Sequence, residues 1–362
     1  MTGSKDEAKA ARYIITQFKA NGIETLNGQF SNTQYLQKFT YKPKLDSTQK
    51  VVTGNNVVGF INNHAKNTII IGAHYDHLGW GLPAHSTYRG EPAIHNGADD
   101  NASGVATVIE LSRILKGSSY KNHNYVFVAF SGEELGLYGS KWFSEHSTYD
   151  STNTSYMLNF DMVGRVDSNK IVISGTGTSP NWNTAFKNIA TPLRIKTTES
   201  GVGPSDHTSF YLKNIPVLHF FSGQHKDYHK PSDDEEKINY AGMDDIINYV
   251  VHLIGQLDTV NKLPFVKTKD DNNEDTPKFK VTLGVMPDYT FDGEGMKIDG
   301  VTEGKPAAKA GLKQGDIVVK LGDVFVKDMR SYMTALSAFK KGDTTKVVVK
   351  RGGEILEKPI TF

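Results

Sequence analysis

Residues 4–258 alternate between two hydrophobic patterns along the chain. Short, nearly continuous apolar runs are typical of buried strands, and we expect strands near residues 36–41, 57–61, 69–71, 125–130, 156–160, 171–173 and 215–221. Segments with apolar residues every third or fourth position predict helices near residues 5–21, 102–115, 133–146, 180–190 and 240–257. Because strands alternate with helices, the pattern predicts an α/β domain with a mixed, largely parallel sheet flanked by helices.

The pattern changes after residue 260. Residues 261–277 are polar and include an acidic run at 270–275, which is typical of a linker. Residues 278–362 then show short β-strands, glycine turns and two short helices. We therefore predict three parts: a large domain at 1–260, a linker at 261–277, and a small β-rich domain at 278–362.

Composition excludes several classes of function. The formal net charge is +1 and 22% of the residues are charged, so no basic excess is present to attract nucleic acid or an anionic membrane. No apolar run approaches the ~18 residues that a membrane span needs. The chain has no cysteine, so any metal site must use His, Asp and Glu, which suits zinc or a similar divalent ion.

The chain opens without a recognisable signal peptide, directly on a segment that predicts a helix capped by Ser4 and ended by Gly22. A domain that begins within its first capping motif is also expected where an upstream targeting segment has been removed. The opening residues therefore do not predict the location of the protein.

Candidate chemistry begins at the stretch IIIGAHYDHLGWG, residues 69–81. It places His74 and Asp76 two positions apart at the carboxyl end of an apolar strand, where residues i and i+2 share a face. We expect the Asp76 carboxylate to hydrogen-bond one ring nitrogen of His74 while the other nitrogen binds a metal.

Four further stretches supply carboxylates or histidine at strand ends or in adjacent loops: GADDNASG, AFSGEELGLYGS, NFDMVGR and DYHKPSDD. Strand ends of an open α/β sheet converge on one crevice, so these residues can meet although they are distant in sequence. Two histidines and three carboxylates suit two divalent ions bridged by one carboxylate, roughly 3.5–4 Å apart. The predicted ligands are His74, Asp100, Glu134, Asp161 and His229.

Simpler explanations exist for each stretch taken alone. Asp99 and Asp100 before a helix could serve as N-caps, and Glu133 and Glu134 could complement a helix dipole. His229 could be an ordinary loop histidine. A carboxylate at Asp161, after a buried strand, is harder to explain without a partner. The order and spacing of all five residues favour the metal site.

The motifs together resemble the co-catalytic double-zinc aminopeptidase family of the bacterial leucyl aminopeptidase type, over about residues 4–258. The resemblance rests on His-x-Asp, Asp-Asn-x-Ser-Gly, Glu-Glu-x-Gly-Leu-x-Gly-Ser, Asn-Phe-Asp-Met-x-Gly, Ser-Asp-His-x-x-Phe and Tyr-His-x-Pro-x-Asp. It implies the zinc exopeptidase fold and a periplasmic or extracellular location. It also implies two zinc ions bridged by Asp100, one completed by His74 and Asp161 and the other by Glu134 and His229.

The same resemblance implies a metallo-aminopeptidase acting on peptides with a free N-terminus. Glu133 is then the general base for a water shared by the zinc ions, Tyr228 a hydrogen-bond donor to the oxyanion, and Asp76 the residue that orients His74. Two other functions stay open. A glutaminyl cyclase-like acyl transferase uses a similar site with one zinc, and a catalytically silent domain could act as an adaptor.

The long loop at residues 77–98 contains three more histidines, His77, His85 and His95. We interpret them as solvent-facing rather than as ligands of a third metal. Asp206 and His207, in the motif Ser-Asp-His-x-x-Phe, resemble a family element beside the site. They could support the ligands or the substrate, and helix capping explains them almost as well.

The C-terminal part resembles a PDZ domain of the bacterial protease-associated type, on the residues Pro306–Ala308, Ala310–Leu312 and Gly315–Asp316. Such domains bind an extended peptide as an added strand and capture its terminal carboxylate with backbone amides. The resemblance implies Leu283, Gly284 and Val285 as the carboxylate-binding loop. Alternatively, the module only docks on the catalytic domain and binds no peptide.

Overall fold

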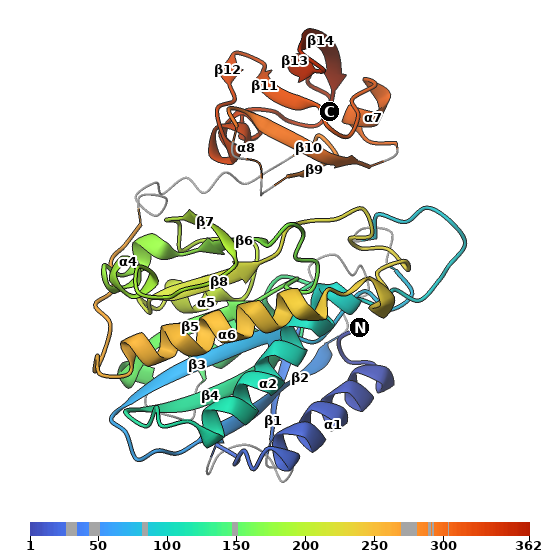
Figure 1. Ribbon diagram of the computed structural model, residues 1–362. Helices are drawn as coiled ribbons and strands as arrows, with labels where there is room; N and C mark the ends of the chain where they lie inside the picture. The colour runs from blue at the N-terminus through green and yellow to red at the C-terminus, as the bar shows by residue number, and fades with distance from the viewer. Residues whose placement is uncertain are drawn as a thin grey trace. The chain divides into compact units, whose positions relative to one another are not determined.

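The computed structural model describes residues 1–26, 35–42, 51–81, 86–146, 151–268, 281–288, 291, 293–302 and 304–362. They form two compact units (Figure 1). The first comprises Met1–Ser222 and His229–Asn272, and the second comprises Gly223–Tyr228 and Asn273–Phe362.

The first unit alternates strands and helices. Its strands are β1 (Leu36–Tyr41), β2 (Val52–Ile61), β3 (Asn67–His74), β4 (His123–Phe130), β5 (Thr154–Phe160), β6 (Lys170–Ser174), β7 (Arg194–Thr198) and β8 (Val217–Phe221). Its α-helices are α1 (Lys5–Ala20), α2 (Gly104–Gly117), α3 (Tyr138–Glu145), α4 (Asn181–Phe186), α5 (His207–Tyr211) and α6 (Tyr240–Leu257). The short strand β7 and the one-turn helix α5 were not anticipated from the sequence, because neither carries a long apolar period.

The strands form one mixed sheet in the order β1-β2-β4-β3-β5-β8-β6-β7. Its centre, β4-β3-β5-β8, is parallel throughout, while β1, β2 and β6 join antiparallel neighbours. The predicted mixed, largely parallel sheet is confirmed. Because the four central strands run in one direction, the segments that follow them emerge at the same edge of the sheet.

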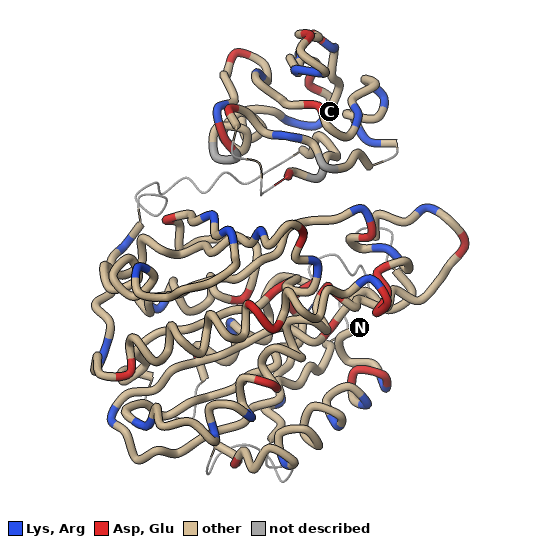
Figure 2. Tube along the Cα trace, viewed as in Figure 1, with Lys and Arg blue, Asp and Glu red and all other residues tan. Residues whose placement is uncertain are grey.

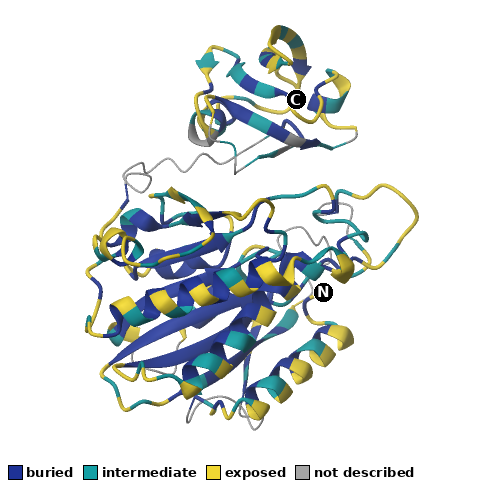
Figure 3. Ribbon diagram, viewed as in Figure 1, coloured by how far each residue is buried: buried dark blue, intermediate teal, exposed yellow. Residues whose placement is uncertain are grey.

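Helices cover both faces of the sheet, as predicted. On one face α1, α2, α4 and α6 pack over a cluster that includes Phe18, Leu111, Trp182 and Ile246. On the other, α3 and α5 contribute Phe143 and Phe210. Figure 3 shows the resulting pattern of burial: the central strands are buried, and the helices are exposed only on their outer sides.

The helix expected from Glu133 begins later, at Tyr138. Gly132, Gly136 and Leu137 all have positive φ, at 77°, 121° and 63°. A right-handed helix does not accommodate these values, so residues 131–137 form a turn instead. Glu133 and Glu134 therefore lie on a turn after β4 and not in the first turn of a helix, which removes the helix-dipole explanation for them.

The described part of the predicted linker packs on the first unit. Leu263 is buried, the Val266 N–H donates to Thr178 O at 2.8 Å, and the Thr268 N–H donates to the Tyr211 hydroxyl at 2.8 Å. Residues 269–280 lie outside the described residues.

The second unit is a small β-rich domain, as predicted. Its sheet has the order β14-β13-β11-β10-β9, with β12 paired to β11. Its core includes Ile298, Val318, Val347 and Ala335. The elements are β9 (Val285–Pro287), β10 (Met296–Val301), α7 (Pro306–Lys309), β11 (Ile317–Leu321), β12 (Val324–Phe325), α8 (Met329–Ser337), β13 (Thr344–Arg351) and β14 (Glu354–Thr361).

Acidic and basic residues are interspersed along both units (Figure 2). Among the described helices, none combines the length and the apolar character needed to cross a bilayer.

Candidate metal centre

The five predicted ligands meet at the carboxyl edge of the central strands. His74 ends β3, Asp161 follows β5, and Glu134 lies on the turn after β4. His229 lies in the loop after β8, and Asp100 lies in a turn, Ala98–Ser103, that leads into α2. Asp100 does not cap that helix, so the capping explanation fails for this residue.

Asp100 lies between the two histidines. Its Oδ1 is 3.4 Å from His74 Nε2, and its Oδ2 is 3.1 Å from His229 Nε2. His74 Nε2 is also 3.4 Å from Asp161 Oδ1, and His229 Nε2 is 3.2 Å from Glu134 Oε2. The donors thus form two groups that share one carboxylate, the arrangement that a bridged pair of cations requires.

These separations fit zinc. Zinc bonds of 2.0–2.1 Å in a tetrahedron place neighbouring donor atoms about 3.3–3.4 Å apart, close to the 3.1–3.4 Å measured in both groups. Asp100 Oδ2 is buried, and none of the residues that the structure describes makes a hydrogen bond to it. A buried carboxylate oxygen needs a positively charged partner, which a bound cation or a protonated His229 provides.

Each terminal carboxylate directs one oxygen at this centre and has the other held by a neighbour. Asp161 Oδ2 accepts a 2.7 Å hydrogen bond from Ser205 Oγ, which in turn accepts one from Asn159 Nδ2 at 2.9 Å. Glu134 Oε1 lies 2.7 Å from His77 Nδ1. An ionised carboxylate only accepts hydrogen bonds, so His77 Nδ1 carries the proton.

Asp76 contacts His74 differently from the prediction. His74 Nδ1 is 3.1 Å from the main-chain oxygen of Asp76, whereas the Asp76 carboxylate is 3.9 Å away. That carboxylate instead accepts hydrogen bonds from Thr2 Oγ1 at 2.9 Å and from the Glu133 N–H at 3.1 Å. The tertiary partners Thr2 and Glu133, invisible in the local sequence, take the oxygens that His74 was expected to use.

Glu133 lies beside the two groups without joining either. Its Oε2 is 4.0 Å from His74 Nε2, and its side chain is only 11% exposed. Burial raises the pKa of Glu133 well above its usual value; His74 opposes this shift, and Asp161 and Glu134 add to it. A raised pKa makes the Glu133 carboxylate more basic than that of an exposed glutamate.

The histidines and carboxylates of the site shift one another's pKa values. Burial lowers the pKa of His229, but Glu134 and Asp100 raise it overall to about 11. Burial likewise opposes ionisation of Glu134, yet His229 and His77 bring its pKa down to about 2. Protons on the histidines thus compensate the carboxylates in the same place where divalent ions would.

The loop histidines are not solvent-facing, so that interpretation was wrong. His77 is 10% exposed at its side chain and contacts Glu134. His95 is buried, with Nε2 2.7 Å from Ser86 Oγ and Nδ1 3.1 Å from Ala93 O. Apolar runs locate strands but give no signal for how a loop folds back over a site. His85 lies outside the described residues.

Two loop contacts that the sequence did not reveal hold the turn and His229. Asp233 Oδ2 accepts the N–H groups of Asp99 and Asp100 at 2.9 and 3.0 Å. The Thr87 N–H donates to His229 O at 3.1 Å, where φ of His229 is +54°. Asp233 had a signal, since it belongs to the motif Tyr-His-x-Pro-x-Asp; Thr87 had none.

Three other predicted residues lie as follows. Asp206 and His207 are fully buried, and the His207 ring stacks on His219 with centroids 4.5 Å apart. Burial raises the pKa of Asp206 to about 7. Tyr228 directly precedes His229 and is half-buried, with its N–H donating to His225 O at 3.0 Å.

Known proteins share this sequence pattern. Aminopeptidase YwaD of Bacillus subtilis is 27% identical over 235 residues, 60% of this chain and 47% of its own length. A probable leucine aminopeptidase of Arthroderma otae is 26% identical over 217 residues, 56% of each chain. The chain thus spans about half the length of these two relatives. An uncharacterized protein of Escherichia coli, YfbL, is 24% identical over 68% of this chain and 86% of its own length.

Solved structures share the fold at low identity. A zinc-dependent exopeptidase from Parabacteroides distasonis matches with a TM-score of 0.58 and 15% identity, covering 70% of this chain and 91% of its own. A glutaminyl cyclase from Porphyromonas gingivalis matches with a TM-score of 0.56 and 17% identity, covering 71% and 91%.

Two family models match the sequence itself. The model described as peptidase family M28 matches residues 56–254, more than half of the chain, and the PDZ domain model matches residues 266–361. The chain therefore belongs to peptidase family M28 and carries a C-terminal PDZ domain.

Proposed function

We propose that this protein is a metallo-aminopeptidase that removes the N-terminal residue of peptides with two zinc ions per chain. Asp100 would be shared by the two ions, with His74 and Asp161 completing one ligand set and Glu134 and His229 completing the other. The observation that carries the proposal is the position of Asp100, with one oxygen facing His74 and the other facing His229. The membership in peptidase family M28 and the aminopeptidase names of relatives support it.

When bound, zinc ions would polarise a peptide carbonyl and lower the pKa of a bound water to about 7. Glu133 then accepts the proton of the attacking water and returns it to the leaving amine. The Tyr228 hydroxyl donates a hydrogen bond to the oxyanion. Asp76 has two positioning roles, since its main-chain oxygen orients His74 and its carboxylate holds the main chain of Glu133. The carboxylates around the ions provide a negative surface for the free amino group of the substrate.

The assay uses the full chain loaded with zinc and aminoacyl chromogenic amides with a free amino group. The matched control substrates carry an N-acetyl group. We expect turnover of the free amines alone, together with two zinc ions per chain by metal analysis. Equal hydrolysis of acetylated substrates, or no turnover with two bound ions, contradicts the proposal; the second result favours a silent adaptor.

A glutaminyl cyclase is the second candidate, because the solved cyclase shares the fold. The bridging position of Asp100 between two complete donor groups argues for two ions and against a site with one zinc. Peptides with N-terminal glutamine separate the two activities. Release of ammonia with retention of the residue identifies a cyclase, and release of free glutamine identifies an aminopeptidase.

For the PDZ domain, we propose that Leu283, Gly284 and Val285 bind peptide C-termini. Gly284 has φ of +76°, and Val285 begins β9, an edge strand of the sheet, which is where an added strand pairs. Titration of labelled peptides into the full-length Glu133→Gln variant, which should leave them uncleaved, tests this role. We expect binding of a free C-terminal carboxylate and at least tenfold weaker binding of the C-terminal amide. No binding of either peptide favours a module that only docks on the catalytic domain.

We also propose a periplasmic or extracellular location, on the resemblance to the bacterial leucyl aminopeptidase type. Cell fractionation of the native source with an antibody against the chain tests it. Recovery of the protein with cytoplasmic markers contradicts this location.

A further inference from the structure

Glu134 and Asp161 are the two terminal carboxylates of the centre, and they are held in matching ways. Asp161 Oδ1 faces His74 while Oδ2 accepts the Ser205 hydroxyl. Glu134 Oε2 faces His229 while Oε1 accepts His77 Nδ1. In each case one oxygen is left for a cation and the other is occupied by a neighbour. His77 thus holds the second oxygen of Glu134 as Ser205 holds the second oxygen of Asp161.

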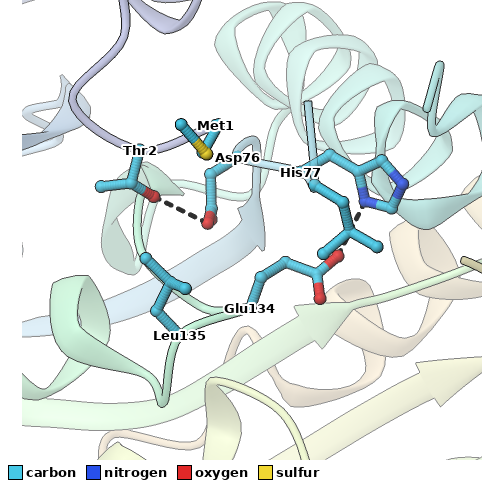
Figure 4. A pocket seen from close by; sticks show the side chains of 7 residues that line it. Met1, Thr2, Asp76, His77, Glu134 and Leu135 are labelled. Atoms are coloured by element: carbon cyan, nitrogen blue, oxygen red, sulfur yellow. Dashed lines mark hydrogen bonds and ion pairs between the residues drawn. The ribbon is translucent and has the colours of Figure 1, made fainter. Parts of the chain in front are cut away.

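The imidazole of His77 is held firmly in this position. His77 lines a small pocket with Thr2, Asp76 and Leu135, and its ring points at the Glu134 carboxylate (Figure 4). Gly97 packs directly on the ring, since a Cβ at this glycine would lie 2.7 Å from His77 Cδ2. The hydrogen bond therefore follows from how the loop folds and not from a free surface rotamer.

Proximity alone would also allow His77 to be a ligand, because His77, Asp100 and Glu134 gather their donor atoms within 4.8 Å. The distances argue otherwise. His77 Nδ1 is 2.7 Å from Glu134 Oε1, a hydrogen-bond length, and 3.9 Å from Asp100 Oδ2. His229 Nε2 lies 3.1 and 3.2 Å from the same two residues, close to the edge of a zinc tetrahedron.

We propose that His77 is a positioning residue of the metal centre, which donates Nδ1–H to Glu134 Oε1 and so holds Glu134 as a single-oxygen ligand beside His229. Without this donor, Glu134 can rotate about its side-chain bonds or turn both oxygens inward. Hydrogen bonds of this kind to a ligand typically change metal affinity by about 10–100-fold. The inference rests on the proposed two-metal function and adds a residue to it.

The test compares zinc affinity in full-length wild-type protein and in the variants His77→Ala and His77→Asn. Asn is the matched rescue, because its Nδ2 is bonded to Cγ as His Nδ1 is and can donate to the same oxygen, whereas it lacks an imidazole ligand atom. His252→Asn is the control, since His252 is exposed on α6. Each protein is stripped with chelator and titrated with zinc against a competing chromophoric chelator, with circular dichroism to verify folding.

We expect His77→Ala to bind one of its two zinc ions about 10–100-fold more weakly. His77→Asn should return to within about threefold of wild type, and His252→Asn should match wild type. Wild-type affinity in His77→Ala overturns the inference. So does weakened binding in both variants, because that pattern means that the ring itself is a ligand or that its bulk matters.

Failure of the proposed function gives a different result. Wild-type protein that binds a single ion overturns the two-zinc proposal by its stoichiometry alone. His77 is then judged on that one ion: a weakened affinity restored by Asn supports the positioning role, and an unchanged affinity overturns it. Wild-type protein that binds no zinc overturns both.

Discussion

Each carboxylate near His74 has its own set of partners. Asp100 faces both histidines, Asp161 and Glu134 each face one, and Glu133 faces neither within 3.5 Å. Glu133 and Glu134 are adjacent in sequence, yet a turn directs their side chains to different places. The same residue type therefore faces His229 in one position and lies beside both donor groups in the other.

Replacement of Glu133 by Gln should lower kcat by about 10²–10⁴ while both zinc ions stay bound, because a general base typically contributes this factor. Steady-state kinetics and metal analysis of the same sample measure the two quantities. Glu110→Gln is the control, since Glu110 pairs with Arg113 on the surface of α2. Loss of zinc from the Glu133 variant would show that this glutamate is a ligand.

At the level of elements, hydrogen bonds join segments that follow different strands of the sheet. Asp233, in the loop after β8, binds the turn that holds Asp100, and its Oδ1 lies 3.2 Å from Arg165 Nη2. Asp233 thus connects the loop that carries His229 with the turn before α2. The metal ligands are held by hydrogen bonds between loops as well as by the strands themselves.

The change Asp233→Asn should weaken this connection. Both oxygens of Asp233 face donors, so the NH2 group of Asn would meet either the two main-chain N–H groups or the Arg165 guanidinium, and neither can accept a hydrogen bond from it. We expect a loss of about 1–3 kcal/mol in the free energy of unfolding. Weaker zinc binding should accompany it. Denaturant unfolding and zinc titration measure the two effects, with Asp234→Asn, its half-exposed neighbour, as the control. Unchanged stability would mean that the loops are held by other contacts.

Helix α1 is attached to the turn at residues 131–137 through a buried carboxyl group. Ser131 Oγ donates to Glu7 Oε1, and the Gly3 N–H donates to Oε2 at 2.5 Å. Burial raises the pKa of Glu7 from 4.5 to about 7. Between these values the folded state binds more protons than the unfolded state, so stability falls as pH rises, by roughly 3 kcal/mol in total.

The Glu7→Gln variant should lack this dependence. Relative to wild type, its free energy of unfolding should rise by about 2–3 kcal/mol between pH 5 and pH 8. Denaturant titrations at both pH values measure the change. Asp6→Asn serves as the control, because Asp6 is exposed on the same helix. A constant difference between Glu7→Gln and wild type would contradict the raised pKa.

The whole molecule has two separate cores, one group of clusters around the large sheet and another in the C-terminal unit. All proposed zinc ligands lie in the first unit. A ligand stabilises only the folded unit that binds it, by about 2.7 kcal/mol at a concentration 100 times its Kd. Bound metal should therefore stabilise the first unit alone.

Calorimetry of the full chain should show two transitions, and chelator should lower the Tm of only one. Val347→Ala, in the core of the second unit, should lower only the Tm of the other transition, which identifies that transition as the unfolding of the second unit. A chelator that lowers both transitions equally would show that the two units unfold together.

Local patterns sufficed to predict much of the fold and to select the candidate ligands. Nearly continuous apolar runs identified β3, β4, β5 and β8, because a strand buried on both faces is apolar at most of its positions. The long helix α6 was predicted at its observed bounds, since one apolar face extends along it. The polar residues after these strands had to converge once the strands were parallel.

Contacts across the sheet edge were decided only by the tertiary structure. Nothing local shows that Thr2 and Glu133 take the carboxylate of Asp76, or that His77 turns inward to Glu134. Such contacts join residues 57 to 74 positions apart, and they depend on how loops close over the strand ends. The sequence by itself therefore determined which residues are candidate metal ligands, and the folded loops decided which side chains hold them in place.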